Sequence, residues 1–220
     1  MWPRLRALLI CGGCASVPAV APVPANPTPE AEFHSSVRPL TGGERNAMIG
    51  VVWREGCPVQ LDELVHVEVG LFHSTGEFGT GVLVVHRDVA KTVTTAFGTL
   101  WALRFPIARM EPMEVFGGDD NVSMTANNSS GFNCRPISGG GRWSEHAMGT
   151  AVDINPLWNP FVRGERVLPE AGRKWAERRD APGQLLLGSP QVRAFTDLGW
   201  GWGGKWTSSK DWQHVSLHGT

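Results

Sequence analysis

The sequence carries almost no net charge and has no long apolar run beyond its N-terminal leader. Lysine and arginine number 20 against 21 aspartates and glutamates, which gives a formal net charge of -1. A chain without an overall positive field has no general attraction for nucleic acid, so we expect no nucleic-acid partner. No later segment offers the roughly 20 consecutive apolar residues of a membrane-spanning helix, so we expect no membrane span in the mature domain.

Tyrosine is absent, whereas tryptophan (10) and glycine (27) are abundant. Hydrophobic residues make up 41% of the chain and charged residues 19%, a balance typical of a packed domain rather than a disordered chain. The tryptophans can wall a cleft or simply fill a core. Six of them lie around the motifs described below, which favours the cleft for some: Trp143, Trp158, Trp200, Trp202, Trp206 and Trp212.

The N-terminus has the pattern of an export signal. Arg4 and Arg6 precede an uncharged, largely apolar stretch over residues 7–20, as in secretory signals. Cys14 offers a second interpretation, a lipoprotein signal whose lipidated cysteine anchors the protein to a membrane. Prolines recur over residues 22–29 and are typical of an extended spacer. We therefore predict a signal peptide (residues 1–25), a Pro-rich stalk (26–45) and one folded domain (46–220).

Only Cys57 and Cys134 remain once the leader is set aside. Two cysteines in an exported chain favour a single disulfide between them. The alternative is a catalytic thiol at Cys134 beside Arg135, which would need a paired histidine.

The pattern of apolar residues predicts an α+β fold with a small antiparallel sheet flanked by helices. Alternation over residues 65–71, a Gly-rich turn and an apolar run over 82–85 predict a β-hairpin. Helical spacing over residues 89–101 predicts a helix with Asp88 as its N-cap. A second helix is predicted after Ser189, with Pro190 in its first turn.

Two of the seven histidines lie beside carboxylates in short alternating runs. His146 and Asp153 belong to S-E-H-A-M-G-T-A-V-D, and His214 belongs to D-W-Q-H. On a straight helix the step from His146 to Asp153 would rise about 10.5 Å, too far for two ligands of one ion. Gly149 can break that path, and the alternation over residues 150–154 predicts a strand that returns Asp153 toward His146.

Two histidines and one carboxylate, with a fourth position left for water, are typical of a catalytic zinc site. Asp211 supplies a second carboxylate that can act as a general base without being a ligand. Spacing alone leaves open that these residues serve only structural hydrogen bonds.

These motifs resemble those of a known family. S-E-H-A-M-G-T-A-V-D is similar to the S-x-H-x-x-G-x-A-x-D signature of zinc peptidases that include VanY-like D-alanyl-D-alanine carboxypeptidases and L-alanyl-D-glutamate endopeptidases. D-W-Q-H is similar to their second element, an acid three residues before the last histidine. The flanking G-F-N-C-R-P-I-S-G-G-G and G-W-G-W-G-G-K-W also resemble a secreted bacterial branch, so that the resemblance covers residues 57–217.

The resemblance implies a zinc peptidase domain with its Zn2+ in a groove. It implies that His146, Asp153 and His214 bind the zinc and that Asp211 is the catalytic base, where many relatives have glutamate. It also implies that Arg135 stabilises the oxyanion or anchors the substrate carboxylate; the alternative for Arg135 is a surface salt bridge. Residues expected to orient the site or wall its cleft are Ser144, Trp143 and Trp212, although either tryptophan can equally belong to the core.

The implied activity is zinc-dependent hydrolysis of peptide bonds in peptidoglycan stem peptides, first of all as a D-Ala-D-Ala carboxypeptidase. The alternatives are an L-Ala-D-Glu endopeptidase and a cell-wall binding module without turnover. A second cation near Arg135, with Arg142 as the candidate, would favour the carboxypeptidase, which must recognise a free terminal carboxylate. Either enzyme would act outside the cell or in the cell wall, which agrees with export.

Overall fold

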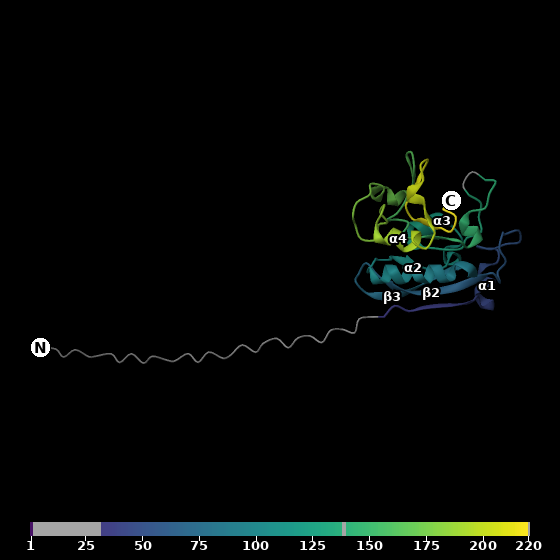
Figure 1. Cartoon of the computed structure of the whole chain (residues 1–220), viewed down its shortest axis with the longest axis horizontal. Helices are drawn as coiled ribbons and strands as arrows, with labels where there is room; N and C mark the ends of the chain where they lie inside the picture. Colours follow the sequence, from purple (N-terminus) through teal and green to yellow (C-terminus); the bar gives the residue numbers. More distant parts are fainter. Residues whose placement is uncertain (2–31, 138–139, 220) are drawn as a thin grey trace. The chain divides into compact units, whose positions relative to one another are not determined.

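A computed structural model describes residues 1, 32–137 and 140–219 of the chain (Figure 1). Apart from Met1, the predicted signal peptide lies outside the described residues, as do Cys14 and the proline-rich residues 22–29. In the part of the chain that is described, no helix has the length and apolar character needed to cross a membrane.

The largest sheet joins β1 (Ser35–Pro39), β2 (Leu64–Phe72) and β3 (Phe78–His86) in that order, all antiparallel. The predicted β-hairpin is thus confirmed, and its two strands extend beyond the apolar runs from which it was predicted. Because β1 pairs with β2 along its whole length, residues 35–39 form part of the sheet rather than of a stalk. The helix α1 (Gly42–Met48) follows directly, so the folded unit begins before the predicted boundary at residue 46.

The helix α2 (Ala90–Ala102) lies on this sheet, and α4 (Pro190–Thr196) lies on the opposite side of α2 (Figure 1). The predicted cap of α4 is confirmed, since the Ser189 hydroxyl accepts a hydrogen bond from the Val192 amide. The predicted cap of α2 is wrong. Asp88 lies within a short 3-10 turn, η1 (Arg87–Val89), and the His86 ring nitrogen accepts the hydrogen bond from the Asp88 amide.

The second half of the chain is built from short elements. A second antiparallel sheet has the order β6 (Ala151–Asp153), β11 (His214–Ser216) and β9 (Gly201–Trp202). A third has the order β10 (Lys210–Asp211), β7 (Phe161–Arg163) and β8 (Arg166–Leu168). The α+β class is confirmed, although the described residues hold several small sheets where one was expected. The remaining elements are the parallel pair β4 (Arg109–Met110) and β5 (Asn128–Ser129), α3 (Asp120–Thr125), and the 3-10 turns η2 (Met113–Phe116), η3 (Glu145–Met148), η4 (Glu170–Trp175) and η5 (Gly203–Lys205).

The main core lies around α2 and joins the two halves of the fold. Side chains of α2 such as Phe97 and Leu100 pack between the apolar face of the β2–β3 hairpin and a layer from β6, β11 and α4. Val152 and Val215 belong to that layer, so the strands that carry the metal motif are fixed from behind by the core. Trp200 and Trp202 are buried in the same core, which corrects the cleft interpretation for these two tryptophans.

A smaller core surrounds a disulfide between Cys57 and Cys134, and both cysteines are buried. The single disulfide is therefore confirmed, and the structure excludes a free catalytic thiol at Cys134. The bond closes a loop with a sequence separation of 77 residues. It links the segment after α1 to the residues that precede the metal motif.

We expect the double substitution Cys57→Ala with Cys134→Ala to lower the free energy of unfolding by about 4 kcal/mol, because a loop of this length restricts the unfolded chain. Urea unfolding followed by tryptophan fluorescence measures the change. A reductant should shift the wild-type transition by a similar amount and leave the double variant unchanged. Equal stability of the two oxidised proteins would contradict the expectation.

Candidate metal centre

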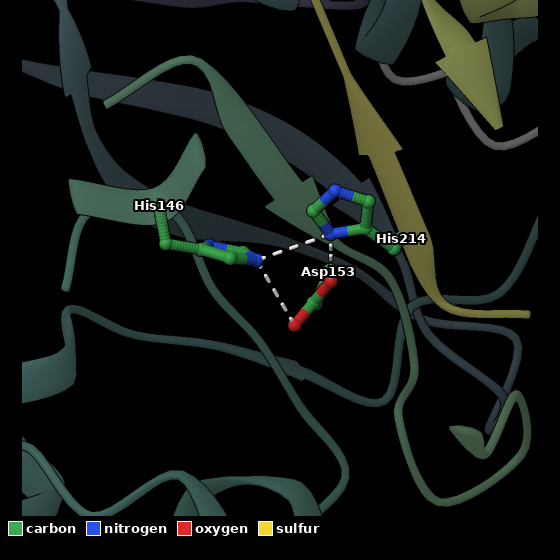
Figure 2. Close-up of side chains that lie close together, drawn as sticks. All are labelled: His146, Asp153 and His214. Carbon is green, nitrogen blue, oxygen red and sulfur yellow. Dashed lines mark hydrogen bonds and ion pairs between the residues drawn. The ribbon is translucent and has the colours of Figure 1, made fainter. Parts of the chain in front are cut away.

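Three buried side chains from different elements meet at one point: His146 from η3, Asp153 from β6 and His214 from β11 (Figure 2). His146 Nε2 lies 3.2 Å from His214 Nδ1 and 3.3 Å from Asp153 Oδ2. His214 Nδ1 lies 3.1 Å from Asp153 Oδ1. The structure thus brings together the three residues that the motifs predicted as ligands.

The spacing of these three donor atoms fits a single tetrahedral metal ion. Zinc ligands lie 2.0–2.2 Å from the ion, so neighbouring corners of the tetrahedron lie ~3.3–3.6 Å apart. The two histidine nitrogens lie 3.2 Å apart, close to this edge length, and each of them lies 3.1 or 3.3 Å from a different oxygen of Asp153, which can offer one of its oxygens to the ion. Two imidazole nitrogens and a carboxylate oxygen are also the donor set that catalytic zinc sites use. The residues present can therefore hold a metal ion without a large rearrangement.

The turn that carries His146 follows from its sequence. The Ser144 hydroxyl caps η3 by accepting a hydrogen bond from the His146 amide at 3.3 Å, so Ser144 orients the backbone of the motif. Gly149 ends the turn with φ of 69°, in the left-handed region that glycine adopts most easily. A Cβ atom at Gly149 would lie 2.6 Å from the His86 amide nitrogen, so a side chain has no room there.

The orientation of His146 is set by a backbone carbonyl. Its Nδ1 lies 2.7 Å from the Gly131 oxygen, which can only accept, so Nδ1 carries the proton and donates. Nε2 is then the nitrogen that faces His214 and Asp153 with its lone pair, as a metal ligand requires. The Gly131 backbone can lie this close to β3 because glycine has no side chain. A Cβ atom at this position would lie 2.4 Å from the Val84 oxygen.

Asp153 is held between two backbone neighbours. It is paired with His214 in the antiparallel register of β6 and β11, and its amide and carbonyl exchange hydrogen bonds with Ser130 on the other side. Burial alone would raise the pKa of the Asp153 carboxyl. The charges and hydrogen bonds of His146 and His214 outweigh burial and hold that pKa well below its usual range. The carboxyl is therefore ionised and ready to bind a cation.

Asp211 lies close enough to the triad for the charges of the triad to shift its pKa. It belongs to β10 and pairs with Phe161 of β7, whereas His214 lies three residues later in another sheet. Burial, together with the negative charge of Asp153, raises the pKa of Asp211 to about 6, although His214 and His146 oppose part of the shift. Its Oδ1 is shielded from solvent and has no hydrogen-bond partner among the described residues. A carboxylate with this pKa can exchange protons near neutral pH.

Arg135 lies beside the motif but is already paired. Its backbone oxygen accepts a hydrogen bond from the Ser144 amide, and its Nε is in ion-pair contact with Asp120 Oδ2. Nε forms no hydrogen bond among the described residues, so the contact with Asp120 is an ion pair. Arg142, the second cation that the sequence suggested, is exposed.

The two tryptophans expected to wall the cleft differ in their surroundings. Trp143 is 38% exposed and is free to contact a ligand. Trp212 packs against the main core, with its ring 5.6 Å from that of Trp202 and the Arg178 guanidinium 5.0 Å away. Trp206 has its ring centroid 5.6 Å from that of His214, a contact that no spacing rule indicated. Trp206 thus packs beside His214.

Comparison with known proteins gives one match. Residues 138–217 match the model of a family described as D-alanyl-D-alanine carboxypeptidase. No curated protein and no solved structure matches the chain. The match includes the three residues of the triad and Asp211, but it begins after Arg135. It confirms the family resemblance over this segment and supports a metallopeptidase.

We expect Gly149→Ala to weaken metal binding and to destabilise the fold by more than 1–2 kcal/mol, because the left-handed backbone and the contact with the His86 backbone both oppose a side chain. The matched control is Gly188→Ala, which has a similar φ of 74° but open space around its Cβ position. Thermal unfolding and zinc titration measure both effects. If the two variants behave alike, the close approach of Gly149 to His86 has no part in shaping the site.

Proposed function

We propose, from the family match over residues 138–217, that this chain is a zinc-dependent peptidase that hydrolyses peptide bonds in peptidoglycan stem peptides, first of all as a D-Ala-D-Ala carboxypeptidase. The observation that carries the proposal is the triad of His146, Asp153 and His214, whose buried donor atoms lie close enough together within the matched segment to share one metal ion. Asp211, with its raised pKa beside this triad, supplies the acid-base group that turnover needs.

The three ligands would hold the ion through His146 Nε2, His214 Nδ1 and an oxygen of Asp153. A zinc ion held by these residues would supply Lewis-acid chemistry, for the scissile carbonyl and for the attacking water. The Asp211 carboxylate accepts the proton of that water and then passes it to the departing amine. The Gly131 carbonyl keeps His146 in the required tautomer throughout, because it accepts the Nδ1 proton.

Arg135 is proposed to bind the substrate through its guanidinium. It can attract the terminal carboxylate of a stem peptide or the oxyanion that forms during hydrolysis. Trp206, whose ring lies 5.6 Å from that of His214, and the exposed Trp143 are proposed to contact the substrate. The intact base and the intact ligand set speak against a binding module without turnover.

The L-Ala-D-Glu endopeptidase stays as the second candidate because of one observation. The charged group that pairs with Arg135 is the acid Asp120, and Arg142 is exposed. Arg142 was the cation expected to help Arg135 recognise a free terminal carboxylate, and its exposed position gives that expectation no support, so the endopeptidase stays open. Digestion of purified peptidoglycan separates the candidates, since release of D-alanine supports the carboxypeptidase and cleavage after L-alanine supports the endopeptidase.

We expect Asp211→Asn to bind one zinc ion per chain and to lose D-alanine release from a pentapeptide stem by at least 100-fold, because a general base contributes 10²–10⁴-fold. His146→Ala should lose both zinc and activity. Zinc content by elemental analysis and released D-alanine are the two measurements. The control is Asp88→Asn, a change at an exposed carboxylate that should leave both unaltered. Absence of zinc from reconstituted wild-type protein would refute the proposal.

We expect kcat/KM to rise with pH on the acidic side of its profile, with an apparent pKa of about 6 or lower. The base must be deprotonated to act, the pKa of Asp211 is about 6 without metal, and a bound cation lowers that pKa. Carboxyl NMR of the metal-free protein should show the pKa near 6, and zinc should move it downward. Asp211→Glu, which keeps a carboxylate, should still show a kcat/KM that falls at acidic pH. A metal-free pKa near 4 would contradict the assignment.

A further inference from the structure

Asp120 has its carboxylate fixed from two sides. Its Oδ2 is in ion-pair contact with Arg135 Nε, and its Oδ1 accepts a hydrogen bond from Asn133 Nδ2 at 2.9 Å. Asn133 also donates from Nδ2 to the Gly118 oxygen at 3.1 Å, so this amide is itself held in place. Asp120 and Arg135 are both about one-third exposed in their side chains, so a ligand can reach them.

The segment of residues 133–135 connects this pair directly to the metal centre. The Asn133 amide donates to the His146 oxygen at 3.1 Å, and the Ser144 amide donates to the Arg135 oxygen at 3.1 Å. Cys134, between them, is fixed by the disulfide to Cys57. The backbone of Arg135 is therefore rigidly tied to the turn that carries His146, and only its long side chain needs a further restraint.

A guanidinium that is restrained at Nε still has its two terminal amino groups available to bind a ligand. The two terminal amino groups of arginine form the fork that accepts a carboxylate through two parallel hydrogen bonds. A free arginine loses rotamer freedom when it binds, and that loss weakens binding. A side chain that is already held by an acid avoids most of this loss.

We propose that Asp120 is a positioning residue that holds the Arg135 guanidinium with its terminal amino groups toward the carboxylate of the peptide substrate. This inference rests on the proposed function and deepens it, because it assigns substrate binding to a pair rather than to Arg135 alone. The opposite arrangement, in which Asp120 competes with the substrate for Arg135, predicts the opposite change on removing the acid.

Asp120→Asn removes the negative charge and keeps the size of the side chain. We expect the KM for an N-acyl peptide ending in free D-Ala-D-Ala to rise on the order of tenfold, with kcat and zinc content little changed, because a charge-assisted contact is lost. For the same peptide with a C-terminal amide, KM should change much less. A loss confined to the free acid is a result that general damage to the fold does not produce.

The matched control is Asp119→Asn. It removes the same charge one residue earlier, at the N-cap of α3, where asparagine caps as well as aspartate. Its KM should equal that of the wild type. Asp120→Glu, which restores the charge, should recover part of the affinity for the free acid.

An unchanged or lower KM for Asp120→Asn would overturn the proposal, since it would mean that the acid is neutral or competes with the substrate. Arg135→Lys removes Nε and should raise KM for the free acid by itself. In the double variant the two effects should not add, because one contact joins the two residues. Additive effects would also overturn the proposal.

The result can be separated from a failure of the proposed function. If the zinc-loaded wild type shows no hydrolysis, calorimetry still compares the affinity of the free-acid and amide peptides for wild type, Asp119→Asn and Asp120→Asn. Weaker binding of the free acid by Asp120→Asn alone supports the positioning role without turnover. Equal binding by all three proteins rejects it. The same calorimetry applies to Arg135→Lys if Asp120→Asn does not fold.

Discussion

The pairing of β6 with β11 is the constraint on which the site depends. It places Asp153 directly opposite His214 and joins two segments that are 61 residues apart in the sequence. Val152 and Val215 occupy the other face of the same two strands and are fully buried in the main core. A slip of β11 by one residue would turn His214 into the core and Val215 outward. Apolar packing around α2 thus fixes the position of the polar triad.

The first part of the fold supports the site from the other side. Residues 130–134 run between β3 and the metal motif: Phe132 bonds to Val84, and Ser130 pairs with Asp153. Gly131 supplies the carbonyl that orients His146, and the disulfide at Cys134 fixes the end of this segment. The three ligands come from the matched region, and some of the groups that orient them, such as Gly131 and Ser130, come from residues before it. The N-terminal sheet is therefore part of the functional unit.

Local features of the fold and of the site could be predicted because they follow from neighbouring residues. The spacing around Gly149, the alternation in β6 and the cap at Ser189 depend on short-range geometry, and the structure agrees with each. The cap of α2 was wrong because His86, which ends a strand, competes with Asp88 for the same turn. The Gly131 carbonyl and the Asp120 partner of Arg135 had no signal in the sequence. Both are contacts between distant segments, which only tertiary packing determines.

Two carboxyl groups of the same site are driven to opposite protonation behaviour by their surroundings. Asp153 faces both histidines, and their attraction keeps its pKa low despite burial. Asp211 is half-buried, and its loss of solvent together with the negative charge of Asp153 raises its pKa to about 6. Such a division of roles is how one site can hold a permanent ligand and a group that exchanges protons.

The D-W-Q-H motif achieves it by placing Asp211 in β10 and His214 in β11, with the bend between the two sheets at Trp212. That bend is held by the hydrogen bond from Trp202 Nε1 to the Trp212 oxygen and by Arg178 against the Trp212 ring. A buried tryptophan, Trp202, thus helps to hold the bend between the base and the ligand, although it lines no groove itself.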